Sequence, residues 1–339
     1  MIITYTSYPR AALIGNPSDG YFGKTIAFVF SNFKAEVVLF ESPELEIIPA
    51  NYDSNIFNSI SELVDDVNLY GYYGGIRLLK AAVKKFYDYC SQNNISLPDK
   101  NFTLRYKSDI PFRLGLAGSS AIITASIRSL MRFYGIKIPN PILANIVYSV
   151  EIDELKIGGG LQDRVAQAYE SPVYMDFNEK IMEKQGYGNY EIIDKDLFPL
   201  LYIAYRKDLS SGSEVVHNNF RERFNFHEPE VLDAIRQWSD LTEQVKDCLL
   251  TRNLSQLPDL INRNFDIRKS VMNISKQNLQ MVSVARSSGA SAKFTGSGGA
   301  IIGTYQDEKM FIKLKKVLNE IGVEVIKPRI ISNNCEDNL

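Results

Sequence analysis

Hydrophobic and polar positions along the chain recur with two different periods, which predict strands in some segments and helices in others. In Asn101–Asp109, the apolar residues Phe102, Leu104 and Tyr106 alternate with polar ones, which is typical of a half-buried strand. Similar runs predict further strands, each bounded by turn residues. These runs are Tyr8–Ile14, Ala35–Phe40, Leu45–Pro49, Val173–Phe177, Leu201–Tyr205 and Val323–Ile330.

Other segments repeat their apolar residues at intervals of three and four, which is the spacing of an amphipathic helix. In Gly71–Cys90, such a stripe contains Ile76, Leu79, Val83 and Phe86. The same spacing predicts helices in several later segments. These begin after Ser120, run from Asn140 to about Glu151, and cover 229–250, 255–271, 275–288 and part of 307–330.

Local signals refine three of these segments. Asn140 followed by Pro141 predicts a helix start with the asparagine as its cap. The polar stretch Asn178–Asn189 predicts loose chain, and we expect a boundary between two units near 190–200. Asn264–Arg268 is expected to lie on a plain surface helix, with an approach to an active site as the alternative.

The order of the expected elements indicates an α+β protein. After residue 195 a strand is followed by helices, a glycine-rich hairpin, a helix and a final strand, an order that suits a ferredoxin-like unit. We therefore predict two domains, 1–195 and 196–339.

Composition excludes several classes of protein. The 339 residues are 45% hydrophobic and 23% charged with a net charge of −2, which fits a folded chain and gives no electrostatic case for nucleic acid or an anionic membrane as a partner. No apolar run predicts a membrane span, and no signal peptide is expected. Cys90, Cys248 and Cys335 are scattered, which favours the reducing cytosol. The two histidines, His217 and His227, cannot build a multi-histidine metal site.

A glycine-rich segment between a strand and a helix carries the clearest chemical signal. Pro111–Ala121 contains Gly115, Gly118, Ser119 and Ser120. Glycine lets backbone N–H groups turn toward a ligand, and the start of the following helix is electropositive, so such a loop can bind phosphate. It is not a Walker A loop, because no Gly-Lys-Ser/Thr is present. Taken alone, the segment is equally a glycine-rich turn with a serine cap.

Three further segments fit the same chemistry. The first, Tyr8–Lys24, reads as a strand that breaks into a loop containing Gly15-Asn16-Pro17-Ser18-Asp19. The second, 158–167, has three glycines followed by Asp163 at the start of a helix. The third, Ser291–Ala300, reads as a glycine-rich hairpin.

Together these segments resemble the GHMP kinases, and the residues at 15–19, 72–75 and 160–167 are similar to those of the glucuronokinase branch. The resemblance covers nearly the whole chain and implies a two-lobed GHMP kinase fold, with an N-terminal mixed α/β lobe and a C-terminal ferredoxin-like lobe. It also implies that ATP is bound by the central motif. The ATP-binding residues are expected to be Pro111, Gly115, Leu116, Ala117, Gly118, Ser119, Ser120 and Ala121.

The resemblance also implies the catalytic and metal-binding residues. Asp163 matches the aspartate that faces the substrate hydroxyl and accepts its proton, and Arg10 matches the arginine beside it. Ser120 and Glu151 are the expected Mg²⁺ ligands, although Asp153 and Glu154 lie close enough in sequence to compete with Glu151.

The expected sugar contacts come from several segments. They are Arg10, Asn16, Ser18, Asp19, Tyr72, Tyr73, Arg164, Gly296 and Ser297. Arg164 is singled out for the carboxylate of a sugar acid, because arginine binds carboxylates with two parallel hydrogen bonds. Arg10, Lys24 and Arg77 remain alternatives for that role.

The implied activity is ATP-dependent phosphorylation of D-glucuronate at its anomeric hydroxyl, giving glucuronate 1-phosphate and ADP. The expected partners are small molecules, a sugar acid and ATP. Galactokinase carries Glu-His where this chain has Asn16-Pro17, so galactose fits less well. Other acceptors of the family, such as a heptose phosphate, galacturonate or a mevalonate-type substrate, stay open, as does a sensor that binds sugar and ATP without turnover.

Overall fold

The computed structural model describes residues 1–49, 74–206 and 214–332. In this part of the chain, three four-stranded sheets support the helices. The first sheet has the order β1-β4-β6-β5, and its strands are Ile2–Ser7, Ala35–Glu41, Phe102–Ser108 and Glu46–Ile48. Only β5 and β6 pair in parallel; the other neighbours in this sheet are antiparallel. The strand expected at 101–109 is thus confirmed.

The second sheet is fully antiparallel and carries the start of the predicted sugar segment. Its order is β2-β3-β7-β8, and its strands are Arg10–Ile14, Lys24–Val29, Val173–Asp176 and Asn189–Ile192. All five residues of β2 are buried, so the polar head of Arg10 is held inside the protein.

Helices α2 (Gly75–Gln92), α3 (Gly118–Tyr134) and α5 (Gln162–Tyr169) pack on these two sheets, and α4 (Asn140–Ser149) packs on these helices. Helices α2 and α3 pack against each other, and α3 also lies on β1 and β4. Helix α4 continues into a π-helical turn, Val150–Glu154, and contacts α5. Because α5 also packs on α3 and β3, it brings the segment after the three glycines to the central motif.

The third sheet lies in the C-terminal half and is also antiparallel. Its order is β10-β11-β9-β12, and its strands are Lys293–Phe294, Ala300–Thr304, Leu201–Tyr205 and Glu324–Ile326. Numbered along the chain, β9, β10, β11 and β12 are the first to fourth strands of this sheet, and their order across the sheet is second, third, first, fourth. This is the ferredoxin-like arrangement that was expected.

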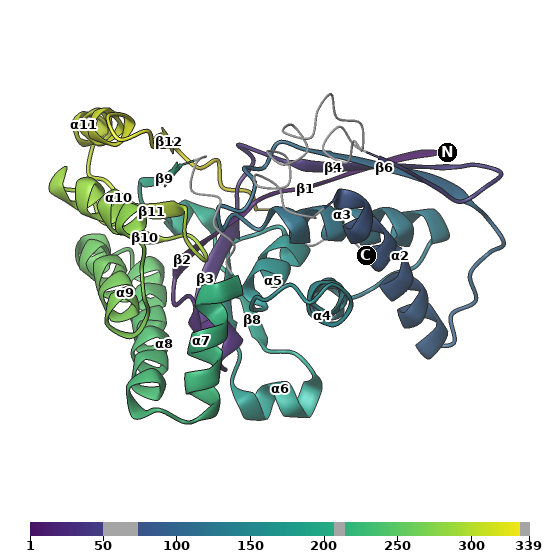
Figure 1. Cartoon of the computed structure of the whole chain (residues 1–339), viewed down its shortest axis with the longest axis horizontal. Helices are drawn as coiled ribbons and strands as arrows, with labels where there is room; N and C mark the ends of the chain where they lie inside the picture. Colours follow the sequence, from purple (N-terminus) through teal and green to yellow (C-terminus); the bar gives the residue numbers. More distant parts are fainter. Residues whose placement is uncertain (50–73, 207–213, 333–339) are drawn as a thin grey trace, which may run out of the picture.

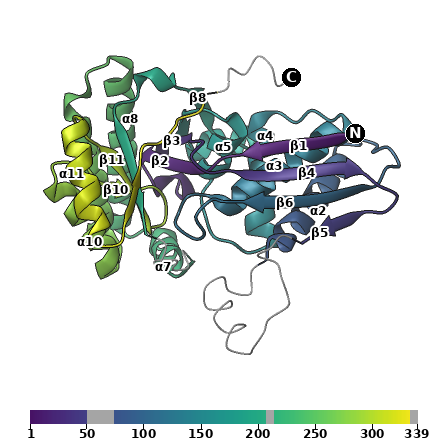
Figure 2. The same cartoon turned by 90° about the horizontal axis from the view of Figure 1, so that it is seen from above.

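The described helices of this half are α7, Glu214–Asn225; α8, Pro229–Leu250; α9, Leu257–Val271; α10, Lys276–Ser287; and α11, Glu308–Asn319. All helices of this half in the described residues except α7, which was not predicted, agree with the predicted segments. Figures 1 and 2 show α8 to α11 gathered at one end of the molecule and α2 to α4 at the other, with β2 and β3 between them. The α+β class is confirmed.

The buried residues form two hydrophobic clusters. The smaller one lies between the third sheet and helices α9 to α11 and includes Tyr202, Phe265 and Met281. The larger one continues from the first two sheets through β9 to α8, where Trp238 is completely buried. The boundary predicted near 195 stays a prediction, and this shared core holds the segments on its two sides together.

Two local predictions are wrong. Asn140 does not cap α4: Pro139 occupies the cap position, and the Asn140 Oδ1 atom instead accepts a hydrogen bond of 2.9 Å from Arg128. Within Asn178–Asn189, expected as loose chain, lies the short helix α6, Glu179–Gln185. Asn178 caps it by accepting a hydrogen bond of 3.1 Å from the Lys180 amide, and Gly186 follows its last residue in the left-handed conformation.

Candidate active site

Strand β2 connects two glycine-rich segments that lie far apart in the sequence. The Arg10 amide donates to the carbonyl of Leu116 at 3.0 Å, and the Ala12 amide donates to the carbonyl of Thr295 at 3.0 Å. Each of these hydrogen bonds joins β2 to a different loop. Amides two residues apart in a strand point to the same edge, so the sequence segments 111–121 and 291–300 lie next to each other along the edge of β2 that does not pair with β3.

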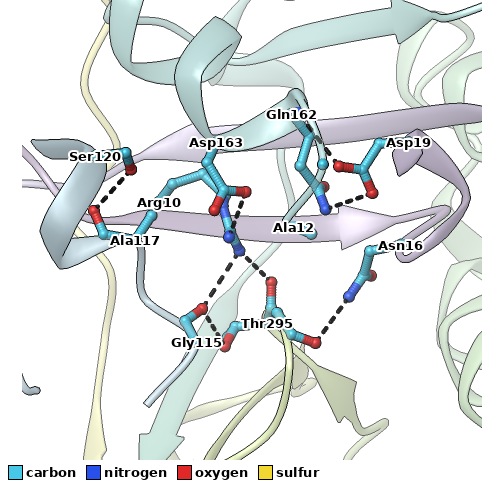
Figure 3. A network of polar contacts seen from close by, with 12 residues as sticks. Arg10, Ala12, Asn16, Asp19, Gly115, Ala117, Ser120, Gln162, Asp163 and Thr295 are labelled. Atoms are coloured by element: carbon cyan, nitrogen blue, oxygen red, sulfur yellow. Dashed lines mark hydrogen bonds and ion pairs between the residues drawn. The ribbon is translucent and has the colours of Figure 1, made fainter. Parts of the chain in front are cut away.

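The side chain of Arg10 strengthens this arrangement. It is only 3% exposed, and its Nη2 atom lies 2.5 Å from Oδ1 of Asp163. Its Nη1 atom donates to the carbonyls of Thr295 at 2.5 Å and Gly115 at 3.4 Å. Figure 3 shows Arg10 reaching from β2 toward Asp163 on one side and Thr295 and Gly115 on the other. One guanidinium thus joins both loops to the carboxylate at the start of α5.

The two loops approach each other so closely that side chains would separate them. Gly115 has a φ of +65°, and a Cβ atom there would lie 2.9 Å from the amide nitrogen of Ser297. A Cβ on Gly296 would overlap the carbonyl oxygen of Gly115. Glycine is required at both positions by contact, and at Gly115 also by the positive φ.

The start of α3 presents backbone N–H groups without a side-chain cap. The preceding residue, Ala117, adopts the left-handed conformation with φ +61°, and within the described residues the helix has no side-chain cap hydrogen bond. The Ala117 carbonyl accepts from Gln167 Nε2 at 2.9 Å and from Ser120 Oγ at 3.2 Å. A left-handed non-glycine residue is strained, so the fold holds this turn in place. The turn leaves the positive end of α3 available to an anion.

Glu151 lies in the π-helical turn after α4, and its carboxylate is only 1% exposed. Its Oε1 atom accepts from Ser119 Oγ at 2.5 Å, and its Oε2 atom is ion-paired with Arg164. Burial alone would lower the pKa of Arg164, but Glu151 and Asp163 more than offset that effect and leave it raised. The guanidinium therefore stays charged and fixes Glu151.

These contacts bear on the two serines of the loop. Ser119, not Ser120, bonds to Glu151, whereas Ser120 is buried and donates to the carbonyl of Ala117, the residue before α3. Ser119 and Glu151 together offer hard oxygen atoms beside an electropositive helix end, the chemistry that suits Mg²⁺ with a phosphate. Among the described residues, no group of three or more His, Cys, Asp or Glu side chains is placed to hold a metal by itself.

Asp19 approaches the same centre from the turn after β2. It is 7% exposed, and its carboxylate accepts from Gln162 Nε2 at 2.9 Å and from the Gln162 amide at 3.3 Å (Figure 3). Burial, and then the negative charge of Asp163, raise the pKa of Asp19 to about 7. A Cβ on Gly160 would overlap this carboxylate, so the third glycine of 158–160 makes room for it. The sequence reasoning did not identify Gln162.

Other predicted sugar contacts have structural partners. Asn16 Nδ2 donates to the carbonyls of Phe294 at 3.3 Å and Gly296 at 3.4 Å, while its buried Oδ1 atom has no hydrogen-bond partner among the described residues. Ser18 is completely buried, and its hydroxyl donates to the carbonyl of Lys24 at 2.9 Å. Tyr72 and Tyr73 lie outside the described residues.

The basic residues considered for a substrate carboxylate are placed differently. Arg164 is fully engaged with Glu151, Asp163 and the carbonyl of Gly160. Lys24 is ion-paired with Asp176 and Glu243. Arg77 is exposed on α2.

The expectation of a plain surface helix at 264–268 is wrong. Asn264 is 1% exposed; its side chain accepts from the Gly15 amide at 2.7 Å and donates to the carbonyl of Asn16 at 3.1 Å. Arg268 is 2% exposed and donates to the carbonyls of Gly296 at 2.7 Å and Ser297 at 3.1 Å. One face of α9 therefore supports both the turn at Gly15 and Asn16 and the glycine-rich loop 291–300. The spacing of four residues could have indicated a shared face.

In the part of the chain that the structure describes, no helix is long and apolar enough to cross a membrane.

Comparisons with known proteins agree with this geometry. Residues 77–171 match the family model described as the GHMP kinases N terminal domain. The chain is 42% identical to "Probable glucuronokinase 2" of Arabidopsis thaliana over 308 residues, which is 89% of this chain and 84% of that protein. It is 40% identical to "Glucuronokinase 1" of the same plant, over 88% of this chain and 84% of that protein.

A solved structure supports the fold. Lactococcus lactis galactokinase, solved in complex with galactose, has a TM-score of 0.74 at 15% identity, covering 98% of this chain and 94% of that one.

Proposed function

The chain belongs to the GHMP kinase family, in the branch of the glucuronokinases, and we propose that it transfers the terminal phosphoryl group of ATP to the anomeric hydroxyl of D-glucuronate. The products are glucuronate 1-phosphate, ADP and the proton released from that hydroxyl. The similarity to two glucuronokinases supports the acceptor. The observation that carries the chemistry is the Arg10–Asp163 ion pair between two glycine-rich loops. We assign this reaction to the cytosol.

Asp163 is the proposed general base. Its carboxylate is 16% exposed, so it is accessible to a substrate hydroxyl, and the ion pair with Arg10 favours its ionised form. The base accepts the proton of the hydroxyl as the oxygen attacks phosphorus, and Arg10 holds the carboxylate in one orientation. Arg10 itself is fixed by the carbonyls of Thr295 and Gly115, so the pair is preorganised.

The start of α3 is the proposed binding site of the ATP phosphates. Its unpaired N–H groups and the positive end of the helix dipole attract negative charge, and Gly115 and Gly118 let the backbone approach the ligand. The nearby loop at Gly296 and Ser297 covers the same strand end and would help exclude water from the transferring group.

For the metal we propose Ser119 and Glu151, in place of the pair Ser120 and Glu151 expected from the sequence. The contact between Ser119 and Glu151 supports this choice, and Arg164 holds the carboxylate in place through an ion pair. A bound Mg²⁺ would neutralise part of the charge on the phosphates.

Asp19 is the proposed receptor for hydroxyls of the sugar ring. Gln162 holds its carboxylate in a fixed position near Asp163. A buried carboxylate accepts hydrogen bonds from two neighbouring hydroxyls, which replaces water lost on binding.

A substrate panel tests the function. ADP release should be measured with glucuronate, galacturonate, galactose and a heptose 7-phosphate, each with ATP and Mg²⁺. We expect glucuronate to give the highest kcat/KM, with formation of the 1-phosphate detected by ³¹P NMR. A higher value with another acceptor would assign the chain to another kinase activity of the family, and ATP and sugar binding without any ADP release would indicate a sensor.

A further inference from the structure

Arg268 is a buried cation whose hydrogen bonds go to neutral acceptors, so they do not balance its positive charge. It lies in the last turn of α9 and is 2% exposed. Its Nη1 and Nη2 atoms donate to the carbonyls of Gly296 and Ser297, and its guanidinium lies over the ring of Phe294 at 5.0 Å. These acceptors are neutral and use two of the five N–H bonds of the guanidinium.

The other two buried arginines of this site are paired with carboxylates. Arg10 contacts Asp163, and Arg164 contacts Glu151. Among the residues that the structure describes, no carboxylate lies within ion-pair distance of Arg268. Burial lowers its pKa to about 10, and Tyr21 and the more distant Asp19 offset that effect only in part. Arg268 is therefore still a cation at neutral pH.

A second buried amine, that of Lys293, is affected by the positive charge of this region. Lys293 Nζ donates to the carbonyls of Ala12 at 2.6 Å and Phe294 at 2.9 Å. Burial, Arg268 and Arg10 all lower the pKa of Lys293, so the proton on Lys293 is disfavoured by its cationic neighbours. A buried region that repels a further positive charge favours an anionic ligand.

Arg268 lies close to residues 15–19, the turn from which several sugar contacts are expected. The carbonyl of Gly296 accepts from Arg268 at 2.7 Å and from Asn16 at 3.4 Å, and in the described part of the chain the buried Oδ1 atom of Asn16 has no hydrogen-bond partner. One turn earlier on α9, Asn264 holds Gly15 and Asn16. Arg268 therefore lies at the turn that leads to Asp19, whereas Arg10 lies beside the proposed base.

We propose that Arg268 receives the C6 carboxylate of the substrate and is the residue that selects a uronic acid over a neutral hexose. This inference rests on the proposed function, because it names the part of the site that reads the acid group. A carboxylate bound there would supply the missing counter-charge, with charge-assisted hydrogen bonds from the free N–H groups of the guanidinium.

The remaining cations near the site are less suited to this role. Arg164 already binds Glu151 with its Nε and Nη2 atoms, so a substrate carboxylate would have to displace a buried partner. Arg221 donates to the carbonyl of Gly20 at 3.2 Å and lies over Tyr21, but it is exposed, so water would weaken its pairing with a carboxylate.

The test compares two substrates that differ only in charge at C6. The kcat/KM values of the unaltered enzyme and of Arg268→Gln should be measured with glucuronate and with glucuronamide, its uncharged amide. We expect kcat/KM of the variant to fall about 100-fold with glucuronate and much less with glucuronamide, because removing one partner of a buried charge pair weakens binding only of the charged ligand. Where amide turnover is too slow, calorimetric Kd values with a non-hydrolysable ATP analogue give the same ratio.

Arg286→Gln is the matched control. Arg286 also donates to two backbone carbonyls and lies over an aromatic ring, that of Phe265, but it is paired with Asp266 on the outer side of α9. We expect this variant to have the same ratio of kcat/KM values for glucuronate and glucuronamide as the unaltered enzyme. If Arg268→Gln lowers kcat/KM equally for both substrates, or for neither, Arg268 has only a structural role and the proposal is overturned.

Two other outcomes are also decisive. If Arg268→Gln does not fold, a crystal structure of the unaltered enzyme with glucuronate should place the carboxylate within hydrogen-bond distance of Arg268, and a carboxylate bound to another cation would overturn the assignment. If the unaltered enzyme does not phosphorylate glucuronate, the proposed function fails. Normal glucuronate turnover together with an unchanged substrate ratio contradicts only the role of Arg268.

Discussion

The Nη2 atom of Arg10 lies 2.5 Å from the Oδ1 atom of Asp163, and the same guanidinium donates to Thr295 in the C-terminal half. The first residue of β2 thus orients a carboxylate on α5 while it anchors the third glycine-rich loop. This contact forms only when three distant segments pack together, and it makes the position of Asp163 sensitive to both loops.

Replacing the proposed base should abolish turnover but leave nucleotide binding intact. For Asp163→Ala we expect kcat to fall about 10³-fold, because a positioned general base contributes about 10² to 10⁴. Affinity for an ATP analogue, measured by calorimetry, should change little. Asp153→Ala is the control, since Asp153 is exposed and, within the described residues, forms an ion pair with Lys85 at 3.5 Å. Near-normal turnover of Asp163→Ala would refute the assignment of the base.

The two serines of the central loop should differ in their effect on magnesium. We expect Ser119→Ala to raise the Mg²⁺ concentration for half-maximal rate by about tenfold or more, since its hydroxyl contacts Glu151. Ser120→Ala should leave that concentration nearly unchanged and cost about 1 kcal/mol of stability through its lost hydrogen bond to Ala117. Titrations of rate against Mg²⁺ decide the matter, and the reverse result would restore Ser120 as the metal ligand.

Sugar binding should depend on pH through Asp19. Its pKa is raised from 3.8 to about 7, and the ionised form is the one that accepts hydrogen bonds from sugar hydroxyls. Below about pH 7, kcat/KM for the sugar should therefore fall by about tenfold per pH unit. In Asp19→Asn this inflection should be absent and the activity low at every pH. A pH profile of the variant that still has the inflection would assign it to another group.

The same shift in the pKa of Asp19 predicts a change in stability without substrate. A carboxyl whose pKa is higher in the folded chain binds its proton more tightly there, so its stabilising contribution is complete below about pH 4 and is lost as the pH rises through about 7. Asparagine resembles the protonated carboxyl. Asp19→Asn should therefore raise Tm more at pH 8 than at pH 5, and an equal change at both values would contradict the raised pKa.

Close approach of the two loops predicts a separation of stability from activity. Gly115→Ala introduces a Cβ at φ +65° that crowds Ser297, whereas Gly135→Ala introduces one at φ +69° with no atom within 4 Å. Both variants should lose about 1 kcal/mol of stability from the left-handed conformation. Only Gly115→Ala should also lose most of its turnover, and equal activity of the two variants would mean that the contact between the loops does not matter for catalysis.

Periodicity in the sequence was sufficient for most helices and strands. The predicted helices at 229–250 and 255–271 agree with α8 and α9, and the strand at 201–205 agrees with β9. Such segments are predictable because burial of one face is repeated at every turn or every second residue. The prediction for Asn140 was wrong because its side chain bonds to Arg128 on another helix, a contact that no local pattern contains.

The glycine-rich motifs and Asp163 determined which family the chain resembles, because each motif is a contiguous run of residues whose backbone geometry is set locally. The partners of the charged side chains were decided only by tertiary structure. Arg164 is ion-paired with Glu151, the hydroxyl of Ser119 and not that of Ser120 donates to the same carboxylate, and Arg268 is buried beside Gly296. Burial and pairing of charges depend on which distant segments meet, and this packing determines which side chains remain available to a substrate.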